Sequence, residues 1–195
     1  FTMLSINFKN KESIFLNGST FIESFAHSVW VAAILLIYIQ VFLKVETFWF
    51  GMINATFFLG LIFAGIMVNF KDSFFQKRTI FFVIYLPIFI GILNISFGLH
   101  KYIYIALVFS FIFGLLDEIR SIILHSVIQL KLTNTQLTNT YILNNMVYSF
   151  SFSISTLLIS YIVDYSSVQF AFFIGGLAYF LVFVLGLIFH RVASV

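Results

Sequence analysis

Six long apolar stretches constrain what this chain can fold into more than any other feature of the sequence. They cover about residues 21–43, 48–70, 79–99, 102–130, 141–163 and 168–189. A helix that crosses a bilayer needs about 20 mostly apolar residues, so each stretch is long enough to span the membrane. The short alternating segments that mark transmembrane β-strands are not found. The sequence therefore predicts an all-α polytopic membrane protein with six transmembrane helices.

The composition leaves little of the chain for a domain outside the membrane. Of the 195 residues, 62% are hydrophobic and 9% are charged, whereas soluble proteins carry about 25% charged residues. We expect residues 21–189 to form a six-helix bundle and residues 190–195 a cytoplasmic tail. Residues 1–20 are expected to be a cytoplasmic N-terminal stretch or a linker between two halves. Because the first residue is Phe, we expect the chain to be a fragment.

The basic residues predict how the chain is oriented in the membrane. The net charge is +3, but the basic side chains are scattered between apolar stretches, which favours a bilayer partner over nucleic acid. The side with only Lys44 and Lys101 is expected to be extracellular, because positively charged loops remain in the cytoplasm. The other side, with both termini, is expected to face the cytoplasm of a cell membrane and carries Lys9, Lys11, Lys71, Lys77, Arg78, Lys131 and Arg191.

The fourth stretch contains a charged cluster far from either of its ends. Asp117 lies about 22 Å along a helix from the start of this stretch, and each intramembrane charge costs about 2.5–3.5 kcal/mol on insertion scales. On a helical wheel, the polar side chains share one half of the helix. The pattern predicts a helix that turns one face toward an aqueous cavity, with five candidate residues for proton coupling: Asp117, Glu118, Arg120, His125 and Gln129.

Different roles are expected within this cluster. Asp117 and Arg120 are three residues apart and are predicted to pair. Glu118 and His125 are then the better proton-coupling candidates, because burial disfavours the charged form of a carboxylate and lets it exchange protons near neutral pH. Two alternatives stay open. The Asp117–Arg120 pair could serve packing alone, or the helix could start later and place the cluster near the membrane surface.

Other polar residues in the apolar stretches have two interpretations. Asn54, Asn144 and Asn145 are candidates for contact with a substrate in a cavity, with hydrogen bonding between helices as the alternative. Glu23, at the start of the first stretch, is expected to extend to the membrane edge. Pro87 is expected to kink the third stretch. Close helix packing is expected at the small residues Gly51, Gly60, Gly65, Gly175 and Gly176.

Motifs of enzymes are not found in the sequence. It has no His-Glu-x-x-His, no Gly-x-Ser-x-Gly and no phosphate-binding glycine loop. There is no cysteine, and the four histidines are dispersed. We therefore predict that the chain is not an enzyme and needs no cofactor and no metal.

Several segments resemble a known family of transporters. The relevant segments are residues 23–33, the run Phe48-Trp49-Phe50-Gly51-Met52-Ile53-Asn54-Ala55, and Phe58-Leu59-Gly60. They look like the opening of the C-terminal half of bacterial major facilitator superfamily (MFS) transporters, in the branch that includes drug and macrolide exporters. The basic loop 69–78 is similar to the loop that joins the second and third helices of each half. The fourth stretch resembles the tenth helix of the family.

This resemblance implies a fold and a function. The chain would be the C-terminal six-helix half of a twelve-helix fold, with substrate bound between the two halves. It implies a proton-coupled secondary transporter that exports small amphipathic compounds, with an N-terminal six-helix half and a small-molecule substrate as partners. The alternatives are a stand-alone six-helix structural or assembly protein without transport activity and, with less support, an intramembrane enzyme.

Reporter fusions test the predicted orientation. A fusion after Lys101 should report an extracellular position, and a fusion after Arg191 a cytoplasmic one, because seven basic residues lie on the side of the termini and two on the other. The measurement is the paired activity of alkaline phosphatase and green fluorescent protein at each site. An extracellular signal at Arg191 would contradict the prediction.

Overall fold

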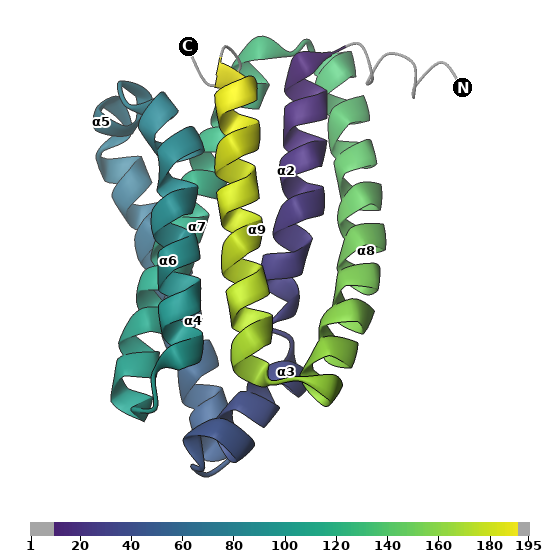
Figure 1. Cartoon of the computed structure of the whole chain (residues 1–195). Coiled ribbons are helices and arrows are strands. Elements are labelled where there is room, and N and C mark those ends of the chain that lie inside the picture. The colour runs from purple at the N-terminus through teal and green to yellow at the C-terminus, as the bar shows by residue number, and fades with distance from the viewer. Residues whose placement is uncertain (1–9, 191–195) are drawn as a thin grey trace.

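Residues 10–190, which the computed structural model describes, are almost entirely helical and contain no strand (Figure 1). Most of the helices run side by side along one common direction, and short connections join them at the two ends of the bundle. In chain order the elements are α2 (Lys11–Ser28), α3 (Ala32–Ile37), the π-helical segment η1 (Tyr38–Leu43), α4 (Phe48–Phe70), α5 (Asp72–Gln76), the π-helical segment η2 (Phe81–Tyr85), α6 (Leu86–Leu99), α7 (Ile103–Lys131), α8 (Asn134–Tyr165) and α9 (Val168–Ile188).

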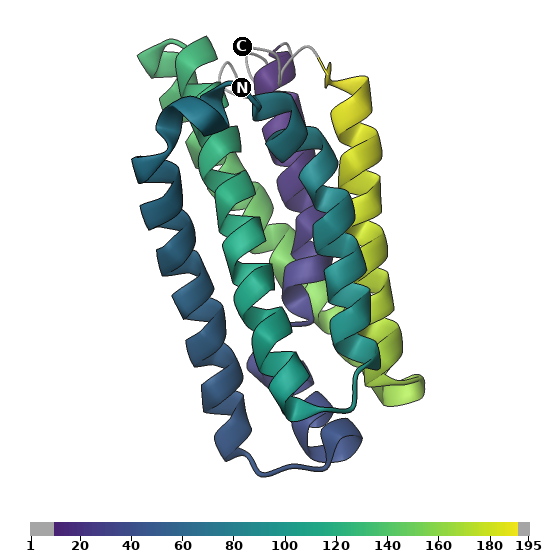
Figure 2. The same ribbon diagram turned by 90° about the vertical axis from the view of Figure 1, so that its left-hand side faces the viewer.

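Within this described part, five helices are long and apolar enough to cross a membrane. The remaining predicted span, α7, has 29 residues and is also long enough, but its three central charges exclude it from that set. It nevertheless runs beside its neighbours along the bundle, in the row α4, α7, α6 and α9 of Figure 2. The structure is therefore an all-α polytopic membrane bundle, in which five helices meet the length and apolarity expected of a span and α7 contains Asp117, Glu118 and Arg120. The five are Lys11–Leu43, Phe48–Phe70, Phe81–Leu99, Asn134–Tyr165 and Val168–Ile188.

Two helices begin earlier than predicted from apolarity. The first span starts at Lys11 rather than at residue 21, so residues 11–20 are helical. Helix α8 starts at Asn134 rather than at residue 141, where Thr133 and Gln136 form a capping box. Both extensions are rich in polar residues, and an apolarity threshold does not detect polar residues whose hydrogen bonds are satisfied inside a bundle.

The two ends of the bundle differ in charge. Helix α2 begins and α9 ends at the same end, which also holds α5 and the turn between α7 and α8 (Figure 1). The opposite end holds Lys44 and Lys101, in the turns before α4 and α7. This arrangement keeps the basic residues separated as the sequence predicts, while Lys9 and Arg191 lie outside the described residues. The basic side chains of the first end are Lys11, Lys71, Lys77, Arg78 and Lys131.

Helices α4 and α7 approach closely at two glycines. A Cβ on Gly60 would lie 2.2 Å from the carbonyl oxygen of Phe111, and a Cβ on Gly114 would lie 2.4 Å from that of Phe57. No side chain fits at such distances, so the two backbones touch there. Small residues permit this approach in membranes, where packing replaces the hydrophobic drive between helices.

Helices α6 and α9 also approach closely at glycines. A Cβ on Gly91 would lie 2.8 Å from the carbonyl oxygen of Gly176, and the reverse distance is also 2.8 Å. The neighbouring Gly175 lies against Asn94 and the backbone of α2. The predictions for Gly60, Gly175 and Gly176 are therefore confirmed. Those for Gly51 and Gly65 are wrong, because a Cβ on either residue would meet no atom of another helix within 4 Å.

Helices α2 and α8 are joined by hydroxyl groups instead of glycines. The hydroxyls of Ser24 and Ser151 share a hydrogen bond of 2.7 Å, and Ser155 Oγ donates to the carbonyl oxygen of Ser24 over 2.9 Å. One end of this seam is completed by Asn144, whose Nδ2 donates to Thr20 Oγ1 over 2.7 Å. Such interhelical hydrogen bonds are a common way for polar residues to join membrane helices.

The helical register changes next to Pro87, where the sequence predicted a kink. Residues Phe81–Tyr85 are π-helical and α6 begins at Leu86, immediately before the proline. Proline has no backbone N–H and cannot serve the carbonyl four residues earlier, which belongs to Val83. Single-turn π segments occur where the regular ladder of hydrogen bonds is interrupted. The Val83 carbonyl is thereby available to another donor.

Adding one methyl group should have different effects at two glycines of α4, Gly60, which is packed against α7, and Gly65, which faces open space. Gly60→Ala should destabilise the bundle by about 1–3 kcal/mol, because the new Cβ would overlap the backbone of α7. Gly65→Ala is the matched control, since its Cβ would meet no atom within 4 Å. Membrane accumulation and thermal unfolding of the purified full-length protein measure both. Equal behaviour of the two variants would contradict the packing seen here.

Candidate functional site

The first span is broken in its middle, and the break carries a tryptophan. Helix α2 ends at Ser28, and Val31 has an extended backbone, with φ −62° and ψ 144°. Trp30 lies in the turn between them, where its Nε1 donates to Asn94 Oδ1 over 3.2 Å. Its ring stacks on Phe113 at a centroid distance of 4.6 Å. Discontinuous helices in membrane proteins often mark binding sites, since irregular backbone at this depth must be buried or line a cavity.

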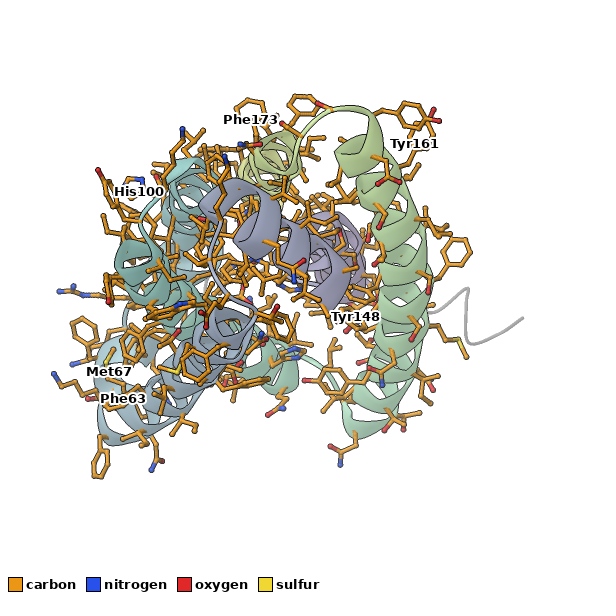
Figure 3. All side chains as sticks on the ribbon, turned by 90° about the horizontal axis from the view of Figure 1, so that it is seen from below. Phe63, Met67, His100, Tyr148, Tyr161 and Phe173 are labelled. Carbon is orange, nitrogen blue, oxygen red and sulfur yellow. The ribbon has the colours of Figure 1, made fainter. Side chains whose placement is uncertain are left out.

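A cavity of about 260 Å³ opens beside this break. Aromatic rings form most of its wall, and one carboxylate and one imidazole interrupt them. Figure 3 shows Tyr148 on the side of α8 that faces α2. The residues come from the α2 break, α4, α7 and α8, and are His27, Trp30, Val31, Phe57, Phe113, Asp117, Tyr148 and Phe152.

His27 and Asp117 form an ion pair in the wall of the cavity. His27 Nε2 lies 3.3 Å from Asp117 Oδ2, and the two side chains are 29% and 18% exposed. Tyr179 of α9 contacts both side chains. Its hydroxyl donates to Asp117 Oδ1 over 2.8 Å and lies 3.2 Å from His27 Nε2. An N–H on His27 Nε2 faces two acceptors, Asp117 Oδ2 and the hydroxyl oxygen of Tyr179. This pair is therefore the charged group that the structure holds in contact with the cavity.

A second ion pair lies deeper in the bundle. Arg120 is 2% exposed and its Nη1 pairs with Glu23 Oε1 of α2, a side chain that is 13% exposed. Arg120 Nε also donates to the carbonyl oxygen of Val83 over 3.4 Å. That oxygen is the one left available before Pro87. The guanidinium thus connects α2, α7 and η2, and Glu23 neutralises its charge.

The predicted pairing within α7 is wrong. Asp117 pairs with His27 and Arg120 with Glu23, so both contacts cross to α2 rather than joining Asp117 to Arg120. The prediction that Glu23 reaches the membrane edge is also wrong, because the helix starts twelve residues before it. Glu23 and His27 are four residues apart and share one helical face. That spacing was the signal in the sequence that could have identified both.

The other predicted residues of α7 lie outside the cavity wall. His125 Nδ1 is 3.3 Å from Tyr141 Oη, and the exposed Gln129 donates to the same hydroxyl over 3.3 Å. Glu118 is partly buried and makes no hydrogen bond or ion pair with the described residues. The polar half of the helix is thus divided, with Asp117 at the cavity and His125 near one end of α8. The proton-coupling roles of Glu118 and His125 stay predictions.

The three asparagines are likewise dispersed. Asn144 contacts Thr20 in the seam between α2 and α8, which is the packing alternative. Asn54 donates to the carbonyl oxygen of Phe50 in its own helix over 2.8 Å. Asn145 is exposed on α8. None of the three lines the cavity beside Trp30, and their contact with a substrate stays a prediction.

Two bacterial transporters are similar to this chain in sequence. The uncharacterized MFS-type transporter YfmI of Bacillus subtilis (strain 168) is 24% identical over 156 residues. The uncharacterized MFS-type transporter YjbB of the same organism is 20% identical over 166 residues. The chain therefore resembles MFS-type transporters. The matched parts are 80% and 85% of this chain.

The similarity supports membrane transport as the general role, and MFS-type transporters are generally not enzymes. The chain spans about two fifths of the length of these relatives, at 38% and 41%. No protein-family model matches the chain, and no solved structure matches it. Within residues 10–190, no group of three or more His, Asp and Glu side chains is arranged to hold a metal ion.

Removing Glu23 should destabilise the bundle more than removing a carboxylate without a partner. Glu23→Gln should cost about 3–5 kcal/mol, because it leaves the buried Arg120 cation uncompensated. Glu118→Gln should change stability little, since Glu118 has no ion-pair partner among the described residues. Thermal unfolding of the full-length protein in nanodiscs compares the two.

A double variant tests the cause of that loss. Glu23→Met with Arg120→Met should recover most of the stability lost in Glu23→Gln, because replacing a whole buried pair by apolar side chains is often neutral. Equal unfolding temperatures for Glu23→Gln and Glu118→Gln would contradict the structural role of Glu23.

Proposed function

We propose that this chain forms the C-terminal six-helix half of a proton-coupled secondary transporter in the cell membrane. The transporter exports small amphipathic compounds, and both termini of the chain face the cytoplasm. The observation that carries the proposal is the cavity of about 260 Å³ with one ion pair in a mostly aromatic wall. The similarity to MFS-type transporters over most of this chain supports it.

The cavity has the composition expected of a site for amphipathic compounds. Small-molecule sites are concave and mostly apolar, with a few polar groups that fix orientation. Five aromatic side chains supply the apolar surface here, and His27 and Asp117 supply the polar groups. Its size is close to the lower end of the range for ligand pockets, about 300–1,000 Å³. An N-terminal half facing this side of the bundle would enlarge it.

The His27–Asp117 pair supports proton coupling. A charged residue inside a membrane is costly and is by default a candidate for an ion or proton pathway. Glu23 and Arg120 neutralise each other in the interior, which leaves Asp117 as the carboxylate at the cavity. Imidazole and carboxylate exchange protons with water that enters the cavity. Asp117 is therefore placed ahead of Glu118 as the coupling carboxylate.

Everted vesicles test the proposal in the full-length protein. Respiration acidifies the vesicle interior, and the fluorescence of an acridine dye reports the gradient. Addition of erythromycin or ethidium as amphipathic probes should dissipate part of the gradient, since an exporter exchanges the compound for protons. Asp117→Asn should abolish this response at unchanged expression, whereas Glu46→Gln, a carboxylate in an exposed turn at one end of the bundle, should retain it.

Two outcomes would contradict the assignment. A normal response of Asp117→Asn with loss in Glu118→Gln would move coupling to Glu118. Absence of any probe-dependent response across a broad panel of amphipathic compounds would favour the alternative of a structural membrane protein without transport.

A further inference from the structure

Three features of the cavity favour the same kind of ligand. Asp117 places a carboxylate in its wall. The C-terminal end of α2 lies at the same place, because the helix stops at Ser28 beside Trp30, and helix C-termini carry partial negative charge. The remaining wall is aromatic except for Val31, and the faces of aromatic rings attract cations. Each of the three stabilises positive charge.

The aromatic rings surround the space from separate helices. Trp30 of the α2 break stacks with Phe57 of α4 at 5.9 Å between ring centroids, and with Phe113 of α7 at 4.6 Å. On α8, Tyr148 stacks with Phe152 at 5.4 Å. Quaternary ammonium groups are recognised by such sets of aromatic rings. A ligand with an apolar body would contact these rings while its charge lies near Asp117.

His27, when it is protonated, supplies a cation to that carboxylate. Its imidazole is attached to the protein, so it competes with any ligand that would pair with Asp117. Imidazole changes charge between about pH 5 and 8. When His27 is protonated, it pairs with Asp117; when it is neutral, the carboxylate loses the cation that contacts it directly.

Other charged and titratable groups lie near His27 and Asp117 in the described part of the chain, and Glu118 follows Asp117 on α7. Glu23, one turn earlier on α2, is already paired with Arg120 of α7. Tyr179 of α9 is a neutral donor to Asp117, and Tyr148 of α8 lines the cavity. From α4 the cavity receives the apolar Phe57. Asp117 and His27 are thus the acid and the base that line the cavity itself.

We propose that the cavity binds organic cations with an aromatic or branched apolar body, and that His27 competes with them for Asp117. The inference rests on the proposed function only in taking this cavity as the substrate site. The balance is simple: a monovalent cation that pairs with Asp117 leaves His27 to release one proton to water in the cavity, so one positive charge enters and one leaves. Cation binding thus weakens as pH falls.

A direct binding experiment tests this without requiring transport. The probe is radiolabelled benzyltrimethylammonium, whose charge is permanent, bound to the full-length protein in nanodiscs at pH 8 and pH 6. Its affinity should fall by about fivefold or more at the lower pH, the range expected for coupled binding sites. Unlabelled benzyltrimethylammonium should displace the probe, and neopentylbenzene, which has the same shape with carbon in place of nitrogen, should not.

Two substitutions of His27 should act in opposite directions. His27→Gln removes the competing charge, so the affinity at pH 6 should rise to nearly that at pH 8. His27→Lys keeps a permanent charge beside Asp117, so binding should be lost at both pH values. Asp117→Asn should also lose binding, while Glu46→Gln should match the unmodified protein. Size-exclusion profiles and thermal unfolding establish that each variant is folded.

The outcomes separate this inference from the proposed function. Displacement by neopentylbenzene as effective as by the cation would overturn the ligand class while leaving a substrate cavity in place. A pH dependence unchanged in His27→Gln would overturn the role of His27. Cation binding with the predicted pH dependence, but no gradient-driven export, would support the site and contradict transport. Absence of cation binding at pH 8 would overturn the inference, whatever the vesicle assay shows.

Discussion

The burial of Arg120 is the constraint on which the rest of this bundle depends. A guanidinium that is 2% exposed in the middle of a membrane helix needs an acceptor for its charge. Glu23 of α2 supplies the carboxylate and Val83 supplies a carbonyl that the nearby proline leaves free. These contacts fix the depth of α2 against α7 and of η2 against both. A shift of one helical turn in either helix would separate the charges.

Because Glu23 satisfies Arg120, Asp117 of the same helix is free for a different role. Asp117 lies three residues away but points to the cavity, where His27 and Tyr179 are its partners. One ion pair is thus almost fully buried and serves packing, while the other is partly exposed and meets the cavity. The exposures of 2% and 13% against 29% and 18% express this division.

Close packing between the helices depends on small and hydroxylated residues. Glycines let α4 reach α7 and α6 reach α9, and serines join α2 to α8. Since lipid is as apolar as the helices, these contacts hold the bundle together in place of a hydrophobic drive. Few residues of α4 and α8 are buried, at 22% and 17% of their most apolar windows. Both helices border the cavity beside Trp30, so the open side of the bundle and the cavity coincide.

Apolarity and length by themselves determined the helical membrane fold and the approximate position of the spans, because lipid demands satisfied backbones and long apolar helices wherever a chain crosses it. The tertiary structure alone decided which charges pair. Glu23 and His27 are distant from Asp117 and Arg120 in sequence, and only the packing of α2 against α7 brings them together. The same holds for Gly60 and Gly65, five residues apart in one helix: a neighbouring backbone lies against the first and open space against the second. Residue type limits the contacts that a position can make. The relative placement of the helices, which long-range contacts fix, decides which of these contacts form.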